Sequence, residues 1–280
     1  MRLATLNDRV VVIDDQRAFD VAEASSGSFG PEPSAVYDRW AEFKAWADGH
    51  TFDGGAVFDP AELGAVSPRA TQVFAIGLNY RAHAAEGGRD VPKVPATFTK
   101  FQTCLAGPYA DVAVPGPTTD WEVELVVVIG ARAHHVAAAD AWSVVAGVTV
   151  GQDFSERTVQ NASGGHFSMG KSFPCFGPTG PWLVTTDELP VDAEGGLDLE
   201  LSCIVSGEQM QLSRTSMMVF PVPALIEYLS AVTPLLPGDL IFTGTPEGVG
   251  FRRTPPRPLL PGDVVESTIE RIGTIRNRMV

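Results

Sequence analysis

Hydrophobic and polar residues alternate along the chain in a pattern that predicts mostly β-strand. From Gln72 onward, short apolar runs bounded by turn residues dominate, and they do not alternate with helices as βαβ units would. The predicted strands of this part are Val73–Ile76, Thr97–Lys100, Trp121–Ile129, Val148–Gln152 and Leu197–Val205. The last strand alternates apolar with polar residues, which is typical of one buried face. The turn Ser206-Gly207 then predicts a hairpin with a strand over Glu208–Leu212.

Residues 1–65 predict a small leading unit that contains both strands and a helix. Short strands are expected over Leu3–Leu6, Val10–Asp14 and Asp20–Ala22. Helical spacing of apolar residues predicts a helix over Ala35–Ala47, with Ser34 as its N-cap. A connector that contains Pro and Gly follows at 59–69. We therefore predict a small α/β domain at 1–65 and a larger domain at 66–280, in an α+β fold that is mostly β.

Two helices and two turns complete the prediction for the larger domain. The helices are expected over Ala138–Ala146 and Val222–Val232. The segments at 237–239 and 261–263 both read Pro-Gly-Asp after two leucines, and each such turn is expected to begin a strand. We interpret this short repeated motif as two similar turns and not as a domain repeat.

Composition and charge exclude several classes of protein. Apolar residues make up 44% and charged residues 19% of the 280 residues, which is ordinary for a globular protein. The net charge of −14 would repel a phosphate backbone, so nucleic acid is not an expected partner. Cys104, Cys175 and Cys203 are too widely spaced for a disulfide framework or a zinc site. Because no apolar leader and no run of about 18 apolar residues occurs, we expect a cytoplasmic protein with no membrane partner.

Two glutamates that stand one residue apart are the most informative feature of the chain. Glu122 and Glu124 lie in the predicted strand Trp121–Ile129, so they share one face and lie about 6–7 Å apart. The strand is apolar on both faces beyond them, which predicts burial on both faces. An exposed edge with solvated charges is the simplest alternative, and the apolar flanks argue against it. Buried carboxylates need positive compensation, and a hard divalent cation with oxygen ligands supplies it.

Asp153 can complete such a site. It ends the predicted strand at Val148–Gln152, on a face whose other members are Gly147, Thr149 and Gly151. Small side chains beside an acid leave room for an ion and a ligand. The residues thus predict a metal site of the two glutamates and this aspartate, and both Mg²⁺ and Mn²⁺ accept such ligands. A bound cation would also admit a small anionic substrate despite the acidic surface.

His83 and Glu86 are candidates for proton transfer. On a helical turn they stand three residues apart and lie side by side. A carboxylate beside an imidazole orients it and raises its basicity, which a water-activating base needs. The glycines at 77, 87 and 88 would suit a mobile lid. An incidental pair on a surface helix is the alternative interpretation.

Four further residues are candidates for contact with a bound anion. If the chain turns helical after Asp153, Arg157 and Gln160 lie on the same side as that aspartate. Lys171 lies in a loop that contains Gly and Pro, where an ordinary surface lysine is the alternative. The glycine-rich turn at 244–250 lacks the Lys-Ser/Thr ending of a phosphate loop. It could present the Thr245 hydroxyl and backbone N–H groups to a carboxylate.

Five segments together resemble the fumarylacetoacetate hydrolase superfamily, in its bacterial branch of acylpyruvate hydrolases and 2-hydroxyhepta-2,4-diene-1,7-dioate isomerases. They are Gly-Leu-Asn-Tyr…His…Glu at 77–86, Asp-Trp-Glu-Val-Glu-Leu at 120–125, Gln-Asp-Phe-Ser-Glu-Arg-Thr-Val-Gln at 152–160, Gly-Lys-Ser-Phe at 170–173 and the segment Pro-Gly-Asp-Leu-Ile-Phe-Thr-Gly-Thr-Pro-Glu-Gly-Val-Gly at 237–250. They occur in the family's order and span the chain from about Gln72 to its end. Residues 1–65 match only loosely, as a variable leading domain.

The resemblance implies a mixed β-sandwich roll, with 66–280 as the catalytic domain, that usually forms a homodimer. It implies Mg²⁺ or Mn²⁺ as the cofactor, held by Glu122, Glu124 and Asp153. His83, Glu86 and Lys171 would be catalytic, with the first two as a water-activating dyad and the lysine on the oxyanion side. The residues implied to contact substrate are Tyr80, Arg157, Gln160 and Thr245.

Two departures from the family's pattern bear on substrate identity. Pro174 follows Lys-Ser-Phe where family members often have aspartate. Phe101 follows Lys100 where many bacterial members have proline. We expect both residues to touch the wall of the pocket, where they would change the substrate and not the metal site.

The reaction implied is hydrolysis of a C–C bond in a 3-acylpyruvate, which releases pyruvate and a carboxylic acid. The substrate would then be a small anionic 2-oxo acid. Two alternatives use the same scaffold without an attacking water: decarboxylation of oxaloacetate and isomerisation of a 2-hydroxy-dienoate. A third is a metal-stabilised binding protein for oxo acids, which would show affinity without turnover.

Overall fold

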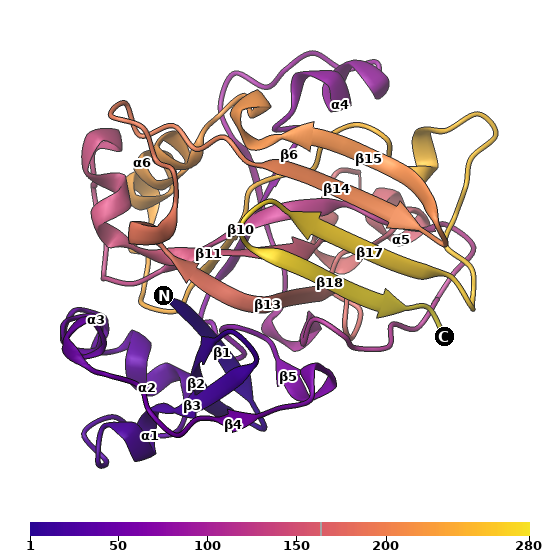
Figure 1. Ribbon diagram of the computed structural model, residues 1–280. Helices are drawn as coiled ribbons and strands as arrows, with labels where there is room; N and C mark the ends of the chain where they lie inside the picture. Colours follow the sequence, from indigo (N-terminus) through magenta and orange to yellow (C-terminus); the bar gives the residue numbers. More distant parts are fainter. Residues whose placement is uncertain (163) are drawn as a thin grey trace.

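Two β-sheets that pack against each other form most of the protein, as the computed structural model shows for residues 1–162 and 164–280 (Figure 1). The larger sheet has the strand order β4-β3-β2-β1-β13-β11-β10-β16-β6-β7, with β5 beside β1 and β8 beside β13. The smaller sheet has the order β15-β14-β17-β18, and β9 pairs with β12 apart from both. The large sheet is mixed, because β6–β16 and β8–β13 are parallel and its other pairs are antiparallel.

The strands and helices have the following bounds, in chain order. The strands are β1 Arg2–Leu6, β2 Arg9–Asp14, β3 Arg17–Asp20, β4 Ala56–Val57, β5 Leu63–Gly64, β6 Val73–Gly77, β7 Ala96–Thr99, β8 Leu105–Ala106, β9 Thr119–Asp120, β10 Val123–Ile129, β11 Val145–Gln152, β12 Ser155–Glu156, β13 Gly177–Thr185, β14 Glu200–Val205, β15 Glu208–Arg214, β16 Leu240–Phe242, β17 Val264–Ile269 and β18 Gly273–Arg278. The α-helices are α1 Val21–Ala24, α2 Pro33–Tyr37, α3 Trp40–Gly49, α4 Arg81–Glu86, α5 Arg157–Ala162 and α6 Val222–Val232. The 3₁₀ turns are η1 Pro60–Glu62, η2 Gln102–Cys104, η3 Ala138–Val144, η4 Phe167–Met169, η5 Thr186–Glu188, η6 Thr215–Met217 and η7 Gly250–Arg252.

The prediction of a mostly β, α+β protein is confirmed, and most strands lie where the pattern placed them. The helix over Val222–Val232 is also confirmed, as is the hairpin at Ser206-Gly207 that joins β14 to β15. Both Pro-Gly-Asp turns begin strands, β16 and β17. In Figure 1 the leading unit lies at one end of the molecule and α4 at the other. Within the described residues, no helix combines the length and the apolar character that crossing a bilayer requires.

Two local predictions were wrong, and a third was confirmed only in part. The helix expected over Ala35–Ala47 is two helices, α2 and α3, and Ser34 lies inside α2 with no capping role. Arg39 leaves the helical conformation between them, and its guanidinium bonds Ser28 O and lies over the Phe29 ring. The strand expected over Asp20–Ala22 gives way to α1, because the Asp20 side chain caps this helix by accepting from Glu23 N–H.

The third prediction, a helix over Ala138–Ala146, is confirmed only in part. The segment forms the 3₁₀ turn η3 and then enters β11 at Val145, which pairs with Ile129. Alanine favours a helix, but the buried ladder between β10 and β11 fixes the backbone here as extended. The strand therefore begins three residues before Val148, where the sequence placed it.

Strand β10 divides the interior into two cores, as its apolar faces predicted. Every residue of the strand is buried. Val123, Leu125, Val127 and Ile129 face the core between the two sheets. Val126 and Val128 face a second core, which the large sheet shares with residues of the leading unit such as Leu3 and Phe43. Buried surroundings on both faces place the two glutamates at the start of β10 in a low-dielectric environment.

The leading unit continues the large sheet. Strand β1 pairs with β13, with Arg2 opposite Val184, and the second core contains side chains from both sides of this contact. The domain boundary near residue 65 stays a prediction.

The close approach of β11 to β13 depends on a glycine. A Cβ at Gly147 would lie 2.2 Å from Val184 O, and a backbone atom cannot move aside cheaply. We expect Gly147→Ala to lower the free energy of unfolding by about 1–3 kcal/mol, the usual cost of overpacking. Urea denaturation measures this loss. Gly49→Ala is the matched control, because nothing lies within 4 Å of a Cβ added there. Equal stability of both variants and the wild type would contradict the packing argument.

Candidate active site

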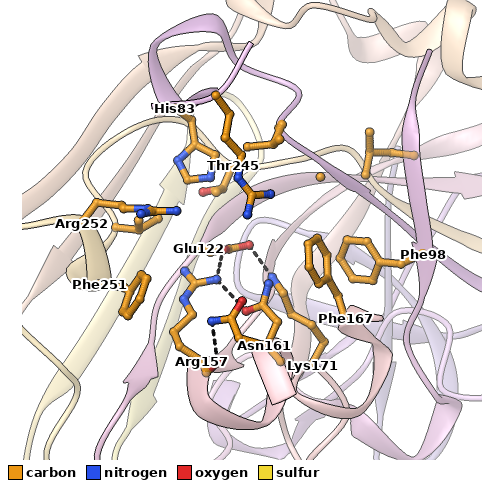
Figure 2. Close-up of a pocket in the computed structure, with 16 residues that line it drawn as sticks. His83, Phe98, Glu122, Arg157, Asn161, Phe167, Lys171, Thr245, Phe251 and Arg252 are labelled. Carbon is orange, nitrogen blue, oxygen red and sulfur yellow. Dashed lines mark hydrogen bonds and ion pairs between the residues drawn. The ribbon is translucent and has the colours of Figure 1, made fainter. Parts of the chain in front are cut away.

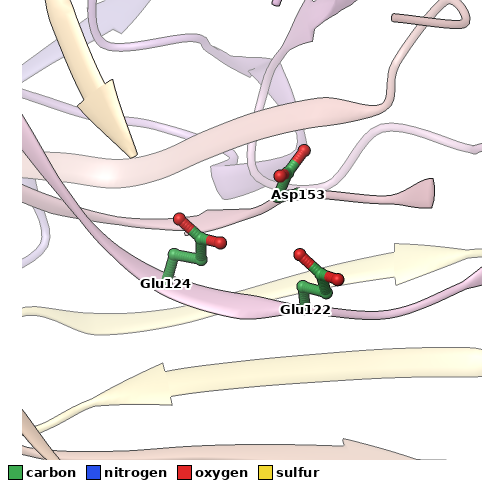
Figure 3. A group of neighbouring side chains, drawn as sticks. All are labelled: Glu122, Glu124 and Asp153. Atoms are coloured by element: carbon green, nitrogen blue, oxygen red, sulfur yellow. The ribbon is translucent and has the colours of Figure 1, made fainter. Parts of the chain in front are cut away.

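Three carboxylates meet where β10 begins and β11 ends (Figure 3). The antiparallel ladder places Val123 opposite Gln152, so Glu122 and Asp153 lie side by side, with Asp153 N donating to Glu122 O at 2.9 Å. Glu124 lies two residues after Glu122 and therefore on the same face of the strand. Oxygen atoms of the three side chains all lie within 4.8 Å of one another, and all three residues are buried.

Three buried cations surround the carboxylates. Lys171 Nζ lies 2.6 Å from both Glu122 Oε2 and Asp153 Oδ2, so its ammonium joins the two strands. Lys100 Nζ lies 2.6 Å from the other oxygen of Asp153. Arg157 Nη1 lies 2.7 Å from Glu122 Oε1 (Figure 2). The alternative of a surface lysine at 171 is therefore wrong, because Lys171 is 2% exposed.

The charges of this buried group do not balance. Asp120, also buried, pairs with Arg157 through Oδ2 at 2.6 Å. The four buried carboxylates thus face three buried cations, which are Lys100, Arg157 and Lys171, and one negative charge is left over. Among the described residues, Glu124 is the member of the group with no ion-pair partner; its Oε2 accepts one hydrogen bond, from Gly244 N at 2.8 Å.

The two glutamates differ strongly in acidity. Burial raises the pKa of Glu124 well above its ordinary value, and the carboxylates of Asp153 and Glu122 raise it further. Burial would also raise the pKa of Glu122, but Lys171 and Arg157 outweigh that effect and lower it to about 2. Without a cation beside it, Glu124 is therefore the carboxylate of the site whose charged form is least favoured.

The site fits a hard divalent cation. It offers three carboxylates whose oxygens lie close together, and oxygen ligands of this kind suit Mg²⁺ and Mn²⁺. It also includes a carboxyl with no ion-pair partner among the described residues, Glu124, whose charged form a bound cation would favour. A buried polar atom without a hydrogen-bond partner lies nearby: the hydroxyl of Tyr80, whose pKa is raised by burial and by Glu124. Glu122, Glu124 and Asp153 are the residues that would hold the ion.

His83 and Glu86 form the expected pair on α4. His83 Nδ1 lies 3.2 Å from Glu86 Oε2, and the other oxygen of Glu86 accepts a hydrogen bond from Gly248 N at 3.1 Å. With Glu86 ionised, Nδ1 carries the proton and Nε2 keeps a free lone pair. The pair is thus held by the 244–250 turn, and His83 lines the pocket.

One pocket is lined by a member of each group, His83 of the dyad and Glu122 of the buried carboxylates. It encloses about 660 Å³ of open space, its mouth included. Its charged or titratable lining residues are His83, Arg89, Glu122, Arg157, Lys171 and Arg252. Its apolar lining residues are Ile76, Leu78, Phe98, Phe167, Val249 and Phe251. The rings of Phe98 and Phe167 meet edge to face at 5.5 Å, and the Lys171 ammonium lies 5.4 Å from the Phe98 ring centre.

Arg157 and Gln160 both line the pocket, but the helix that carries them begins later than expected. The chain does not turn helical after Asp153, because Ser155–Glu156 form β12 and pair with β9. Helix α5 begins only at Arg157, which makes the two residues neighbours one helical turn apart. Arg157 Nη1 donates to Gln160 Oε1 at 3.0 Å, which leaves the amide N–H groups of Gln160 as donors for the pocket.

The structure places the two other predicted substrate contacts less favourably. Thr245 lines the pocket, but its hydroxyl donates to Val123 O and accepts from Gln211 Nε2, both at 2.9 Å. It has no second proton to donate to a substrate carboxylate. Tyr80 is 1% exposed and is not a lining residue of this pocket.

The two departures from the family's pattern do not touch this pocket, contrary to our expectation. Neither Phe101 nor Pro174 is among its lining residues. Phe101 is 51% exposed, and its N–H donates to Ser172 Oγ at 3.0 Å.

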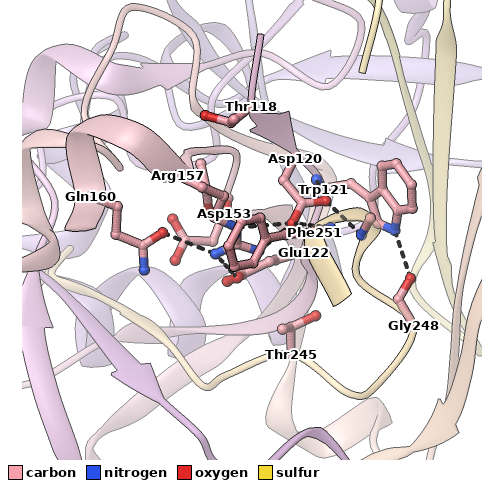
Figure 4. A network of polar contacts seen from close by, with 12 residues as sticks. Thr118, Asp120, Trp121, Glu122, Asp153, Arg157, Gln160, Thr245, Gly248 and Phe251 are labelled. Atoms are coloured by element: carbon pink, nitrogen blue, oxygen red, sulfur yellow. Dashed lines mark hydrogen bonds and ion pairs between the residues drawn. The ribbon is translucent and has the colours of Figure 1, made fainter. Parts of the chain in front are cut away.

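The sequence argument assigned no functional role to two residues that matter here. Lys100 is fully enclosed and bonds Asp153 and two backbone carbonyls, those of Lys171 and Phe176. Asp120 accepts from Arg157, Trp121, Gly250 and Phe251, and so ties α5 to η7 (Figure 4). A lysine at the end of a predicted strand and an aspartate beside Trp-Glu-Val-Glu were the available signals.

Comparison with known proteins places this architecture in a family. The family described as "Fumarylacetoacetate (FAA) hydrolase C-terminal" matches residues 72–280. The oxaloacetate tautomerase Fahd2a of Rattus norvegicus is 43% identical over 214 residues, which cover 76% of this chain and 67% of that protein. The human oxaloacetate tautomerase FAHD2A is 43% identical over 215 residues, with the same two coverages.

Solved structures agree with this placement. A candidate HpcE protein from Mycobacterium smegmatis has a TM-score of 0.94 and 45% identity, over 100% of this chain and 99% of that one. The maleylpyruvate hydrolase of Sphingobium sp. SYK-6, solved with manganese(II) and pyruvate, has a TM-score of 0.81 and 27% identity over 100% and 99% of the chains. The likeness confirms the predicted β-sandwich fold. With these matches in sequence and structure, the chain belongs to the fumarylacetoacetate hydrolase family.

Proposed function

We propose that this protein is a divalent-metal-dependent enzyme that hydrolyses a C–C bond of a 3-acylpyruvate and releases pyruvate and a carboxylic acid. One observation carries the proposal: His83 and Glu122 line the same pocket. His83 belongs to the dyad with Glu86, and Glu122 belongs to the group of buried carboxylates. One group can activate water, and the other can hold a Lewis acid. The Sphingobium hydrolase, solved with manganese(II) and pyruvate, supports a 2-oxo acid as the ligand class.

The metal-binding residues determine which end of the substrate is activated. A divalent cation held by Glu122, Glu124 and Asp153 would, when bound, polarise the 2-oxo oxygen and attract the adjacent carboxylate. The head of the substrate would therefore lie beside Lys171. The acyl arm would extend along the apolar wall of Phe98 and Phe167.

The residues of the chain itself would carry out the proton transfers. His83 Nε2 would accept a proton from water while Glu86 holds the ring and balances the charge of the imidazolium. The hydroxide would attack the distal carbonyl carbon, and the N–H groups of Gln160 and Lys171 would stabilise the oxyanion. Collapse of the oxyanion would break the C–C bond, leave its electron pair on the pyruvate fragment and form the carboxylic acid. The proton on His83 would then return to that fragment.

A second candidate function is tautomerisation of oxaloacetate. It is favoured by the 43% identity to tautomerases over three quarters of the chain. The reaction moves a proton between carbon and oxygen and uses no attacking water, so His83 would serve as the proton shuttle. Both candidates use a cation and a 2-oxo acid, and they differ in whether a C–C bond breaks.

Turnover of matched substrates by a His83 variant tests the proposal. We expect Mn²⁺-dependent pyruvate release from acetylpyruvate, and we expect His83→Ala to lower kcat by about 100- to 10,000-fold, the usual contribution of a general base. Thermal stabilisation by Mn²⁺ should be unchanged in this variant, because His83 is not a metal ligand. His134→Ala, an exposed histidine outside the pocket, is the matched control.

The outcomes separate the two candidates. Cleavage of acetylpyruvate at the wild-type rate by His83→Ala would refute the assigned base. Conversion of enol-oxaloacetate to the keto form, with no pyruvate from acetylpyruvate, would establish the tautomerase instead.

Substitutions at the two glutamates test the metal site independently of turnover. In EDTA, Glu124→Gln should leave the free energy of unfolding unchanged or raise it, because it removes a carboxyl whose charged form is disfavoured and keeps an acceptor for Gly244 N–H. Glu122→Gln should lower it by about 3–5 kcal/mol, because Lys171 and Arg157 both lose a buried partner. Urea denaturation in EDTA measures both values.

Addition of Mn²⁺ should then show whether Glu124 is a ligand of the metal ion. At about 100 times its Kd, the ion should stabilise the wild type by about 2.7 kcal/mol. Glu124→Gln should lose most of this gain. A Glu124→Gln variant that gains as much from Mn²⁺ as the wild type does would rule out Glu124 as a ligand.

A further inference from the structure

Two arginines at the rim of the pocket have no part in the chemistry above. Arg89 follows α4, and Arg252 is the last residue of η7; both line the pocket. Across residues 1–162 and 164–280, neither guanidinium has an ion-pair or hydrogen-bond partner. Arg157 and Lys171, the cations at the floor, are instead both bound to Glu122. The rim therefore carries two cations with free donors.

The two arginines belong to segments that meet at the rim. A Cβ added at Gly87, two residues before Arg89, would lie 3.5 Å from Arg252 Nη2, an ordinary contact distance. Figure 2 shows Arg252 beside His83, at the edge of the space above Glu122. The end of α4 and the turn η7 thus present their positive charges to one opening.

Buried Asp120 holds the turn that carries Arg252. Asp120 Oδ1 accepts from Gly250 N at 2.7 Å, and its Oδ2 accepts from Phe251 N at 3.2 Å. The same Oδ2 accepts from Arg157 Nε at 2.8 Å. One buried carboxylate therefore holds both the turn that carries the rim arginine and the arginine that pairs with Glu122.

The charge of the rim opposes that of the protein. The chain has a net charge of −14, and the one carboxylate among the lining residues, Glu122, is already paired with two cations. Two unpaired guanidiniums at the mouth of a pocket concentrate a positive potential there and attract an anion. A guanidinium pairs best with a carboxylate, through two parallel hydrogen bonds.

We propose that Arg89 and Arg252 bind the second carboxylate of a 2-oxo dicarboxylate substrate, at the opposite end of the pocket from the buried carboxylates. The proposal rests on the proposed function, which places the 2-oxo acid head at the floor. The rings of Phe98, Phe167 and Phe251 line the pocket and provide an apolar wall for the carbon chain between the two ends. The rim arginines thereby select dicarboxylates over monocarboxylates with the same head.

Binding of two ligands that differ only at the distal end tests this subsite. The probes are 2-oxoglutarate and 2-oxopentanoate, which share the 2-oxo acid head and have similar chain lengths. Calorimetric titration of the Mn²⁺-loaded protein gives both affinities without any turnover. We expect the wild type to bind 2-oxoglutarate about 10- to 100-fold more tightly, the effect of one or two charge-assisted hydrogen bonds. The variant R89Q/R252Q should lose this preference and keep the wild-type affinity for 2-oxopentanoate.

A neighbouring arginine provides the matched control. Arg253 adjoins Arg252 in sequence, does not line the pocket, and lies 3.5 Å from Glu208. R253Q should keep the preference for 2-oxoglutarate. A preference that survives in R89Q/R252Q while both ligands still bind would refute the rim subsite alone. Failure of both ligands to bind the wild type would refute the 2-oxo acid site at the floor, and the subsite with it.

Discussion

The burial of four carboxylates is the constraint on which the rest of the site depends: three lie where β10 begins and β11 ends, and Asp120 lies in β9. Carboxylates in such an environment are costly unless cations lie against them. Lys100, Lys171 and Arg157 come from three separate segments, so their ion pairs hold those segments to the sheet. The same pairs leave Glu124 uncompensated, which is the condition a divalent cation satisfies. One charge distribution therefore underlies both the stability of the site and its fit to a metal ion.

Two carboxylate acceptors, Glu86 and Glu124, connect the buried charges to helix α4. Glu86 links α4 to the 244–250 turn through Gly248 N, while the other end of that turn donates to Glu124 through Gly244 N. Gly244 has φ +100°, and a Cβ there would lie 2.7 Å from Asn79 Cβ, so a side chain would separate these contacts. The proton-transfer pair and the carboxylates are thus held by two ends of one short turn, which fixes their relative positions.

The sequence was sufficient for the parts of the site that depend on strand periodicity. A period of two places Glu122 and Glu124 on one face, and an antiparallel partner strand brings Asp153 to them. The sequence was insufficient where pairing between strands far apart in the chain determines the backbone conformation. Arg157 was expected on a helix that begins at Asp153, but pairing of β12 with β9 delays the helix. Lys100 looked like the end of a strand, because its partner Asp153 lies in a segment brought to it only by the folded sheet.

The distribution of charge also explains how an acidic protein can favour an acidic ligand. The buried cations are neutralised by the carboxylates beside them, so they contribute little potential at the mouth of the pocket. A divalent cation at Glu124 would reverse the excess charge of the floor from negative to positive. The rim already carries unpaired positive charge from Arg89 and Arg252. A ligand with an anionic group at each end would then meet positive charge at both ends and aromatic rings between them. The overall charge of −14 would govern solubility, while these local charges govern recognition.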